Sequence, residues 1–386
     1  MKAIVSGAGI SGLTLARCLA DDGWQVTVVE RAPGLRDEGY VIDFFGSGYD
    51  VAERLGLIPA LRAVAYDFPE VEFCDAAGTR QATISYDAMR RELRGKLLSL
   101  MRGDLERVLF ETLPGSVALR YACTIDRIEN GPQGVRATLS DGTVLEADLL
   151  AGADGIHSNV RALVFGAEEA FLRDLGFRVG IYLFRDAATR EELGSRFPLV
   201  SVPKRMVGLF ALRDGRIMAF FVHAGREAAP SPDPAQVLRN IYGDLGWCVP
   251  RALAHAGEGP VYFDTVAQIE MPSWRRDRVV LVGDACAAVS LLAGQGASLG
   301  MAMGYVLCEE LRKAGDIDAG LKRYESRLKT ALADKQKGGR DAASSFVPMT
   351  RRQLALRNLM LRAAKLPLLG GLLTRLFLSG SESVIH

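Results

Sequence analysis

The feature that most constrains the fold is a glycine-rich turn between a short apolar strand and a helix at the start of the chain. Residues 3–12 read AIVSGAGISG. In this pattern Gly7 permits a tight turn, Gly9 lets the backbone approach a ligand closely, and Gly12 lets the following helix pack against the strand. The helix, expected over residues 10–21, presents free N–H groups and the positive end of its dipole. The turn therefore predicts a site for a pyrophosphate.

A second strand follows, and it ends in an acid. Residues 25–30 read QVTVVE, so Glu30 stands eighteen residues after Gly12. A carboxylate at this place accepts hydrogen bonds from a ribose diol and repels a 2′-phosphate. Together with the turn, which includes Ser11 at the start of the helix, it predicts an adenosine dinucleotide with a free ribose, either FAD or NAD.

A second glycine-rich segment favours FAD. Residues 279–307 begin with a strand, continue through Asp284 at its end, and enter a long helix by way of Gly294 and Gly296. Backbone N–H groups near Ala297 are then free to face a ligand. The dipole of that helix stabilises the negative charge of a reduced isoalloxazine near N1 and O2, which a nicotinamide does not carry.

A third segment, residues 147–161, is another strand with an acid and a glycine at its end. We expect Asp154 to meet the ribityl or pyrophosphate region and Arg161 to hold the loop. Residues 97–113 have helical spacing, and Arg102 within them is expected to pair with a cofactor phosphate. The alternative for Arg102 is a salt bridge to Glu106, one turn further on.

Bulk properties indicate a two-domain globular protein without a nucleic-acid partner. The 386 residues exceed one ordinary core, and 47 basic against 46 acidic residues give a net charge of +1. The six cysteines form no CxxC pair and are expected to be reduced and buried, and the histidines have no metal-ligand spacing. The chain opens on a strand rather than a signal peptide, and its apolar stretches are too short to span a bilayer. We therefore expect a cytoplasmic protein with no metal and no transmembrane segment.

The pattern along the chain predicts an α/β fold: a Rossmann-like FAD-binding domain with an inserted, mainly β-sheet substrate domain and C-terminal helices. Strand-like runs separated by polar loops dominate residues 171–274, and residues 71–84 alternate as a hairpin. We also expect three or four short strands between residues 117 and 153, and a short helix near residues 51–57. The expected boundaries are 1–70, 98–170 and 275–335 for the FAD-binding domain, 71–97 and 171–274 for the substrate-binding sheet domain, and 336–386 for the C-terminal helical segment.

These motifs resemble the class A flavoprotein monooxygenases, the fold group of para-hydroxybenzoate hydroxylase. The glycine turn, the DG motif at Asp154-Gly155 and the GD motif at Gly283-Asp284 occur in the family's order over roughly residues 1–330. The segment GQGASLG…GYVL is similar to the single-component branch that includes the tetracycline-inactivating monooxygenase. Residues 39–57 match the loop that runs under the flavin in these enzymes.

The resemblance implies a role for each candidate residue. Glu30 would hold the adenosine ribose, while Arg31 and the backbone of Ile125 would lie by the adenine. Arg102 and Asp284 would line the pyrophosphate and ribityl chain, and Asp154 would belong to the loop that contacts both FAD and the nicotinamide. Gly294, Gly296 and Ala297 would surround the flavin O2 end. The sequence departs from the family's pattern at Ala287, Leu291 and Met303, where many members have histidine, proline and aspartate.

The resemblance also implies the reaction. NADH or NADPH would reduce FAD, O2 would add at the flavin C4a, and the hydroperoxide would hydroxylate an aromatic or polyketide-like small molecule. Without a second dinucleotide fingerprint, the nicotinamide would visit only transiently. No side-chain nucleophile is required, so no catalytic residue is assigned. A flavin enzyme of another type (a dehydrogenase, reductase or Baeyer–Villiger oxygenase) and a non-catalytic flavin-binding homologue remain alternatives. The expected assembly is a monomer or homodimer.

Weaker signals leave alternatives open. His157 lies in the DG loop, where it would touch substrate or nicotinamide or simply face solvent. The basic, leucine-rich tail over residues 336–386 is either a terminal helix pair packed on the body, which we favour, or a membrane-surface helix. Aromatic and acidic candidates for the pocket wall are Tyr40, Asp43, Phe44, Phe45, Tyr182, Phe210 and Phe221.

Overall fold

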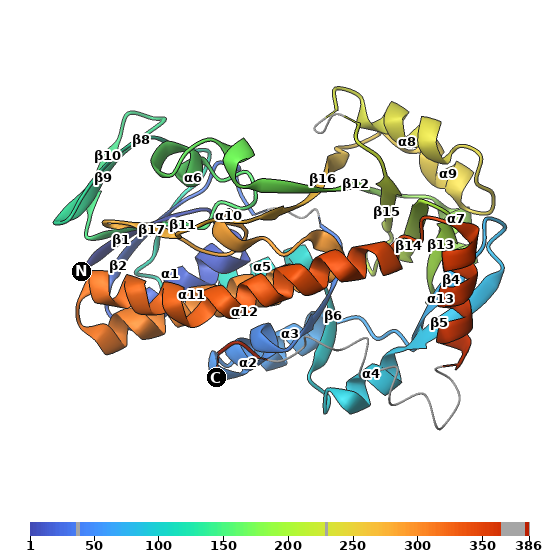
Figure 1. Cartoon of the computed structure of the whole chain (residues 1–386), viewed down its shortest axis with the longest axis horizontal. Coiled ribbons are helices and arrows are strands. Elements are labelled where there is room, and N and C mark those ends of the chain that lie inside the picture. Colours follow the sequence, from blue (N-terminus) through green and yellow to red (C-terminus); the bar gives the residue numbers. More distant parts are fainter. Residues whose placement is uncertain (36–38, 228–230, 364–382, 386) are drawn as a thin grey trace.

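The computed structural model describes residues 1–35, 39–227, 231–363 and 383–385, and of residues 341–345 it describes the backbone alone. A mostly parallel sheet lies at one end of the molecule and a larger mixed sheet at the other, and one long helix runs alongside both (Figure 1). The α/β class is as predicted. As also predicted, the chain returns to the parallel sheet after it has formed the mixed sheet.

The parallel sheet brings the ends of the motif-bearing strands together. Its strands, in spatial order, are β17 (Arg275–Arg276), β18 (Val279–Leu281), β11 (Leu149–Gly152), β1 (Lys2–Ser6), β2 (Gln25–Val29) and β7 (Ala118–Arg120). Strand β1 lies in the middle, parallel to β2 on one side and to β11 on the other, and only the edge strand β17 is antiparallel. The carboxyl ends of β1, β2, β11 and β18 therefore share one edge, on both sides of the point where the strand order reverses, which is where α/β sheets bind ligands.

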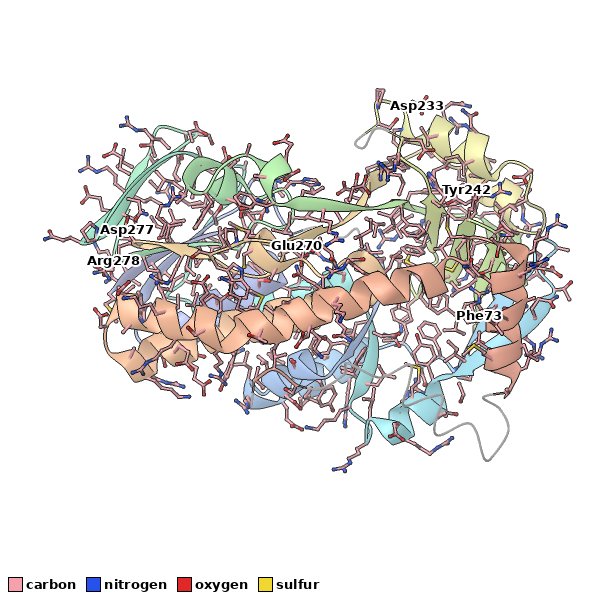
Figure 2. All side chains as sticks on the ribbon, in the orientation of Figure 1. Phe73, Asp233, Tyr242, Glu270, Asp277 and Arg278 are labelled. Atoms are coloured by element: carbon pink, nitrogen blue, oxygen red, sulfur yellow. The ribbon has the colours of Figure 1, made fainter. Side chains whose placement is uncertain are left out.

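The larger sheet has seven strands and two differently covered faces. In spatial order they are β16 (Tyr262–Ile269), β12 (Leu172–Phe184), β15 (Ile217–Ala224), β14 (Arg205–Ala211), β13 (Phe197–Val202), β4 (Glu70–Cys74) and β5 (Arg80–Ser85). Tyr242, at the end of a helix that follows β15, belongs to the core on the outer face, and Phe73 of β4 belongs to the core on the inner face, with residues such as Leu292. Figure 2 shows Tyr242 and Phe73 on opposite sides of this sheet.

Two small sheets complete the β-structure of the described residues and correct two expectations. They are β3 (Val41–Phe45) paired with β6 (Leu97–Met101), and β10 (Val144–Ala147), β9 (Gly134–Leu139) and β8 (Ile125–Gly131). The expected helix over residues 97–113 is wrong at its start: β6 is fully buried, so every position is apolar or small and no strand alternation is visible. Residues 117–153 hold five strands rather than three or four, because the run from β10 to β11 is divided at Asp148 between two sheets.

The bounds of the helices are α1 (Ile10–Asp21), α2 (Ser47–Arg54), α3 (Ile58–Val64), α4 (Tyr86–Glu92), α5 (Arg102–Glu111), α6 (Asn159–Val164), α7 (Ala187–Leu193), α8 (Pro234–Tyr242), α9 (Val249–Ala254), α10 (Asp284–Ala287), α11 (Gly296–Ala314), α12 (Ile317–Phe346) and α13 (Arg351–Ala363). Helices α1, α5 and α11 overlap the expected ones, whereas α3, α4, α6, α7, α9 and α10 were not expected. The expected helix at residues 51–57 begins earlier, as α2. Figure 1 shows α12 running from the side of the parallel sheet towards the mixed sheet.

The C-terminal segment packs on the body as far as it is described. Helix α13 contacts β5 and β13 and buries Leu361, whereas Leu356, Leu359 and Met360 are exposed. Residues 364–382 and 386, which belong to the leucine-rich tail, lie outside the described residues. No helix in the described part of the chain is long and apolar enough to cross a membrane. All six cysteines are buried and form no disulfide with one another, where the sequence predicted reduced and mostly buried thiols.

Candidate active site

A cavity of about 160 Å³ lies at the carboxyl edge of the parallel sheet, against the inner face of the mixed sheet. It is lined by the start of α1, the residues around β3, the start of α5, the loop after β11, strands β12 and β16, and the segment from α10 to the start of α11. Seven predicted cofactor-binding residues line it: Gly9, Ser11, Arg102, Asp284, Gly294, Gly296 and Ala297. These residues come from three separated segments of the chain, and the fold brings them around one space.

The first turn of α1 presents backbone N–H groups to this cavity. Gly9 is its N-cap and contributes no capping side chain, so the first N–H groups are available to a ligand. A Cβ built on Gly9 would lie 3.4 Å from Glu106 Oε1 and 3.7 Å from Arg102 Nη2. The bare backbone at Gly9 and the guanidinium of Arg102 therefore face the same small volume, which suits a diphosphate.

Gly7 and Gly12 shape the turn rather than line the cavity. Gly7 has a φ of +103°, and a Cβ there would lie 2.5 Å from the carbonyl oxygen of Ala153. A Cβ on Gly12 would lie 2.0 Å from the carbonyl oxygen of Gly7. Both distances are far below van der Waals contact, so the turn fits between β1, α1 and the loop after β11 only because these positions are glycines.

Arg102 forms the salt bridge to Glu106 that its sequence offered, and it also lines the cavity, where pairing with a cofactor phosphate stays a prediction. Its Nη2 lies 2.8 Å from Glu106 Oε1, and its side chain also faces the cavity. Burial by itself lowers the pKa of the guanidinium, but Glu106, Tyr40 and Asp284 together raise it above its usual value. Arg102 therefore stays cationic, and the salt bridge to Glu106 holds the charge beside Gly9.

Asp284 and the start of α11 form the opposite wall. Asp284 lies deep in the protein, and burial raises the pKa of its carboxyl, which Arg102 partly offsets. Its side chain nevertheless has accessible surface because it faces the cavity. At the N-cap of α11, Gln295 makes no side-chain capping bond, and a Cβ built on Gly294 (φ +65°) would meet no atom within 4 Å. Uncapped N–H groups beside open space are what a flavin O2 end requires.

Glu30, Arg31 and Ile125 lie at the far side of the glycine turn and do not line the cavity. The Glu30 carboxylate accepts hydrogen bonds of 2.8 Å from the backbone N–H groups of Ala8 and Ala32. Arg31 is exposed beside it, and the carbonyl of Ile125 accepts a hydrogen bond from Asn159 Nδ2. An extended dinucleotide with its diphosphate at Gly9 would reach Glu30 with its adenosine end.

Asp154 organises the DG loop from within. Its Oδ1 accepts a hydrogen bond from Ser158 Oγ at 2.5 Å and its Oδ2 one from the N–H of Val160 at 3.0 Å, so the flanking residues rather than Asp154 itself line the cavity. Arg161 is fully buried and donates to the carbonyl of Ala285 and to that of Ile156. It therefore ties the loop after β11 to the segment that carries Asp284, which is the loop-holding role expected for it.

Tyr262 and Asp264 are wall residues that were not expected. Both lie on β16, and the Tyr262 hydroxyl donates to Asp264 Oδ2 at 2.8 Å. Their only trace in the sequence is a tyrosine and an acid two positions apart at the start of a strand, which places them on one face. His157 Nε2 lies 3.0 Å from the same Asp264 oxygen. His157 thus pairs with β16 rather than pointing into solvent alone.

The prediction of an aromatic wall is wrong for most of its residues, because their side chains lie on other faces of the strands. Of the seven candidates only Tyr40 lines the cavity. Tyr182 and Phe221 stack on each other with centroids 5.7 Å apart in the outer core, on the far side of the sheet. The buried Asp43 accepts hydrogen bonds from Tyr86 and Ser99 instead of facing a ligand. Alternation predicts which residues share a face but not which face is covered by the other sheet. The remaining candidates pack in the cores: Phe44 with the parallel sheet, and Phe45 and Phe210 on the inner face of the mixed sheet.

The three departures from the family's pattern fall in different places. Leu291 lines the cavity, so this substitution changes the wall itself. Ala287 and Met303 are buried in the core of the parallel sheet, where Met303 is 1% exposed. Among the described residues, no group of three or more histidine, cysteine or acidic side chains is arranged to hold a metal ion.

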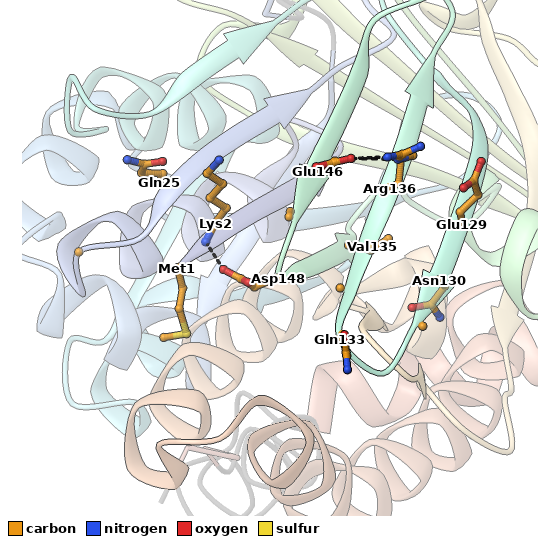
Figure 3. Close-up of a pocket in the computed structure, with 14 residues that line it drawn as sticks. Met1, Lys2, Gln25, Glu129, Asn130, Gln133, Val135, Arg136, Glu146 and Asp148 are labelled. Carbon is orange, nitrogen blue, oxygen red and sulfur yellow. Dashed lines mark hydrogen bonds and ion pairs between the residues drawn. The ribbon is translucent and has the colours of Figure 1, made fainter.

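A larger hollow, of about 1010 Å³, lies at the opposite edge of the parallel sheet (Figure 3). It opens to solvent between the amino ends of β1 and β2 and the small sheet of β8–β10. Two pairs of its polar groups bond with each other: Asp148 Oδ2 accepts a hydrogen bond from the N–H of Lys2, and Arg136 pairs with Glu146. Ligands of α/β sheets bind at the carboxyl ends of the strands, so the smaller cavity is the candidate active site.

The ring of His157 gives a prediction about pH. The hydrogen bond with Asp264, helped by the one with Glu168 and opposed by burial, raises the pKa of His157 to about 9. Because this folded-state pKa exceeds the usual value of about 6.5, the stabilisation is complete below pH 6.5 and is lost as pH rises towards 9. We expect the difference in unfolding free energy between the wild type and His157→Gln to fall over this range by up to about 1 kcal/mol, since the ring is partly exposed. Urea titrations between pH 6 and 10 measure it, and a constant or rising difference would contradict the pairing.

Known proteins are similar to this chain in sequence and, for one solved structure, in fold. The family model described as "FAD binding domain" matches residues 1–333. An uncharacterized protein of Mycobacterium tuberculosis (strain H37Rv) is 33% identical over 323 residues, which cover 81% of this chain and 85% of the relative. A flavin-dependent monooxygenase from an unknown prokaryotic organism is 28% identical and covers 92% of this chain and 94% of its own length. The crystal structure of tetracycline destructase Tet(55) superposes with a TM-score of 0.81 and 27% identity, covering 94% of this chain and 95% of that one.

The match to the family model extends over most of the chain and ends within three residues of the limit expected from the motifs. The matched residues include all three segments that surround the cavity. Together with the named monooxygenase relatives, this match places the chain in the family of FAD-binding-domain proteins, as an FAD-dependent class A monooxygenase.

Proposed function

We propose that this enzyme uses NADH or NADPH and O2 to hydroxylate an aromatic or polyketide-like small molecule. The observation that supports this most directly is the single cavity shared by the α1 N-terminus, the α11 N-terminus and the inner face of the mixed sheet. Bound FAD would supply the chemistry that activates O2 and transfers one oxygen atom. The tetracycline destructase likeness supports a polyketide-like substrate.

The residues of the chain would act by binding and by excluding water. The N–H groups at Gly9 and Ser11, with Arg102, would neutralise the diphosphate, and Asp284 would accept hydrogen bonds from the ribityl chain. Glu30 would hold the adenosine ribose with Arg31 and Ile125 beside the adenine, and the DG loop around Asp154 would contact the cofactor through its backbone. The N–H groups at Gly294, Gly296 and Ala297 would stabilise negative charge on the reduced flavin.

The mixed sheet lines the substrate side of the cavity with the polar side chains of Tyr262, Asp264 and Thr265 and with an apolar part. Val179 and Val266 from the mixed sheet and Leu291 from the segment after α10 form the apolar part. This part favours a flat, uncharged ring and keeps water from the reacting atoms. In the proposed enzyme no side chain acts as a nucleophile, the nicotinamide binds transiently, and the protein is a cytoplasmic monomer or homodimer.

The cofactor assignment predicts the effect of two substitutions. Glu30→Ala and Asp284→Ala should each weaken FAD binding by about tenfold or more, because each removes hydrogen bonds from a charged group, worth about 1.5–3 kcal/mol. The mixed sheet should stay folded in both. Flavin-to-protein ratio after gel filtration measures retention, and circular dichroism checks the fold. Asp67→Ala, at an exposed acid outside the cavity, serves as the control. Stoichiometric flavin in both variants would show that these residues do not hold the cofactor.

The reaction is tested by a visible spectrum of the purified protein and a screen of aromatic compounds that monitors NAD(P)H loss. We expect bound flavin, substrate-stimulated NAD(P)H oxidation, and a product heavier by one oxygen atom that originates from labelled O2. A product without oxygen from O2 would favour a flavin dehydrogenase or reductase. Flavin binding with no stimulated oxidation would favour the non-catalytic homologue, for which the changed residues Ala287, Leu291 and Met303 are the motivation.

A further inference from the structure

His157 links two segments that are 107 positions apart in the sequence. Its Nε2 lies 3.0 Å from Asp264 Oδ2 on β16, and its Nδ1 lies 2.9 Å from Glu168 Oε1. With a carboxylate at each nitrogen, both nitrogens donate, so the ring is the imidazolium form. The histidine therefore clamps the loop after β11 to the mixed sheet by charge as well as by hydrogen bonds.

This pair crosses the wall of the candidate active site. Asp264 lines the cavity and is 6% exposed, whereas the side chain of His157 is 42% exposed. Gly155 and Ile156, immediately before the histidine, line the cavity too. We call the boundary between residues 153–158 and β16 the seam. Solvent lies on one side of the seam, and the space that would hold the reacting atoms lies on the other.

The groups around the pair keep it in place. Asp264 also accepts hydrogen bonds from the Tyr262 hydroxyl and, at Oδ1, from the N–H of Thr265 at 2.7 Å. On the other side of the ring, Glu168 is paired with the buried Arg161 at 2.7 Å. The charges that face His157 are therefore two carboxylates, each held by a further donor, and the seam is crossed by a continuous polar chain.

We propose that His157 is a positioning residue that seals this seam, so that its ion pair with Asp264 keeps bulk water out of the cavity while oxygen is transferred. The proposal rests on the proposed function. In the coupled reaction, substrate, O2, NAD(P)H and a proton give hydroxylated substrate, NAD(P)+ and water. In a wet cavity, O2, NAD(P)H and a proton give NAD(P)+ and H2O2, and the substrate is left unchanged.

The test compares His157→Ala and His157→Gln with His255→Ala. His255 is the matched control, because its Nδ1 makes a histidine–glutamate pair of the same 2.9 Å length with Glu258 and it lies outside the cavity wall. The first measurement is hydrogen–deuterium exchange of residues 153–158 and 262–266 in each protein as purified. The second is H2O2 released per NAD(P)H consumed, with the compound that most stimulates oxidation in the screen above.

We expect roughly fivefold faster exchange at both segments in His157→Ala, the change for an ion pair worth about 1 kcal/mol. A smaller increase is expected in His157→Gln, which keeps one donor, and none in His255→Ala. H2O2 yield should rise in the same order while flavin content stays constant. If His157 instead contacted the ligand directly, its substitution would raise KM and leave the exchange rates and the H2O2 yield unchanged. That result would overturn the seal.

The two proposals fail in different ways. Unchanged exchange and peroxide yield in His157→Ala, with flavin bound and NAD(P)H oxidised, would refute the seal and leave the monooxygenase standing. If the unsubstituted protein oxidised no NAD(P)H with any compound, the proposed function would fail, while the exchange measurement would still decide whether His157 holds the seam closed.

Discussion

Gly12→Ala is expected to abolish folding of the parallel-sheet region, although it adds a single methyl group. The new Cβ would lie 2.0 Å from the carbonyl oxygen of Gly7 and 3.3 Å from the Val5 side chain. No rotamer relieves a clash between Cβ and backbone, so α1 must separate from β1. The expected cost is about 4 kcal/mol or more, a large part of the stability of an ordinary domain. Loss of soluble protein, or a strongly lowered unfolding midpoint in urea, would show it.

Substitutions of two other glycines distinguish an effect on folding from an effect on cofactor binding. Gly9→Ala meets only side-chain atoms at 3.4 and 3.7 Å, and its extended backbone suits any residue, so the variant should fold. Its methyl group would occupy the place of closest approach to the diphosphate, and FAD affinity should fall by about tenfold or more. Gly115→Ala, with no atom within 4 Å of the new Cβ, should change neither. A Gly12→Ala protein as stable as wild type would contradict the packing of the turn.

Arg161→Ala is expected to be the most damaging substitution of a charged residue. The guanidinium is fully buried, with Nη1 2.9 Å from the carbonyl oxygen of Ala285 and Nη2 2.7 Å from that of Ile156 and from Glu168. Removing it leaves these carbonyls unpaired and the carboxylate without its buried partner. Breaking such a buried pair costs about 3–5 kcal/mol. Urea unfolding at pH 7 measures this loss.

The same substitution should release the cofactor, because Arg161 joins two walls of the cavity. Ile156 belongs to the loop after β11, and Ala285 is next to Asp284. The matched control is Arg173→Ala, an exposed arginine 3.2 Å from Glu270, which should cost less than about 1 kcal/mol. Arg161→Met, which keeps most of the volume, should still lose flavin. Retention of both stability and flavin by Arg161→Met would show that packing, not hydrogen bonding, joins the two walls.

The sequence was most informative where chemistry depends on local backbone geometry. A strand, a tight glycine turn and a helix N-terminus are formed by consecutive residues, and an acid at the end of the next strand has a fixed place beside them. For this reason Gly9 and Asp284 were expected near one ligand, and the structure places both around one cavity. The family resemblance added a predicted role for each candidate residue, because three such motifs occurred in a known order.

Tertiary structure alone decided which faces meet and which distant side chains pair. Alternation along β12 put Val179 and Tyr182 on opposite faces, but only the packing of the two sheets made the face of Val179 the inner one. Strand β6 is buried on both sides, so its sequence carries no period that separates strand from helix. His157 and Asp264 meet because β16 crosses the loop after β11. Local sequence determines backbone conformation, whereas these contacts follow from the burial of apolar surface over the whole chain. No short segment contributes enough of that burial for the contacts to be predicted from it alone.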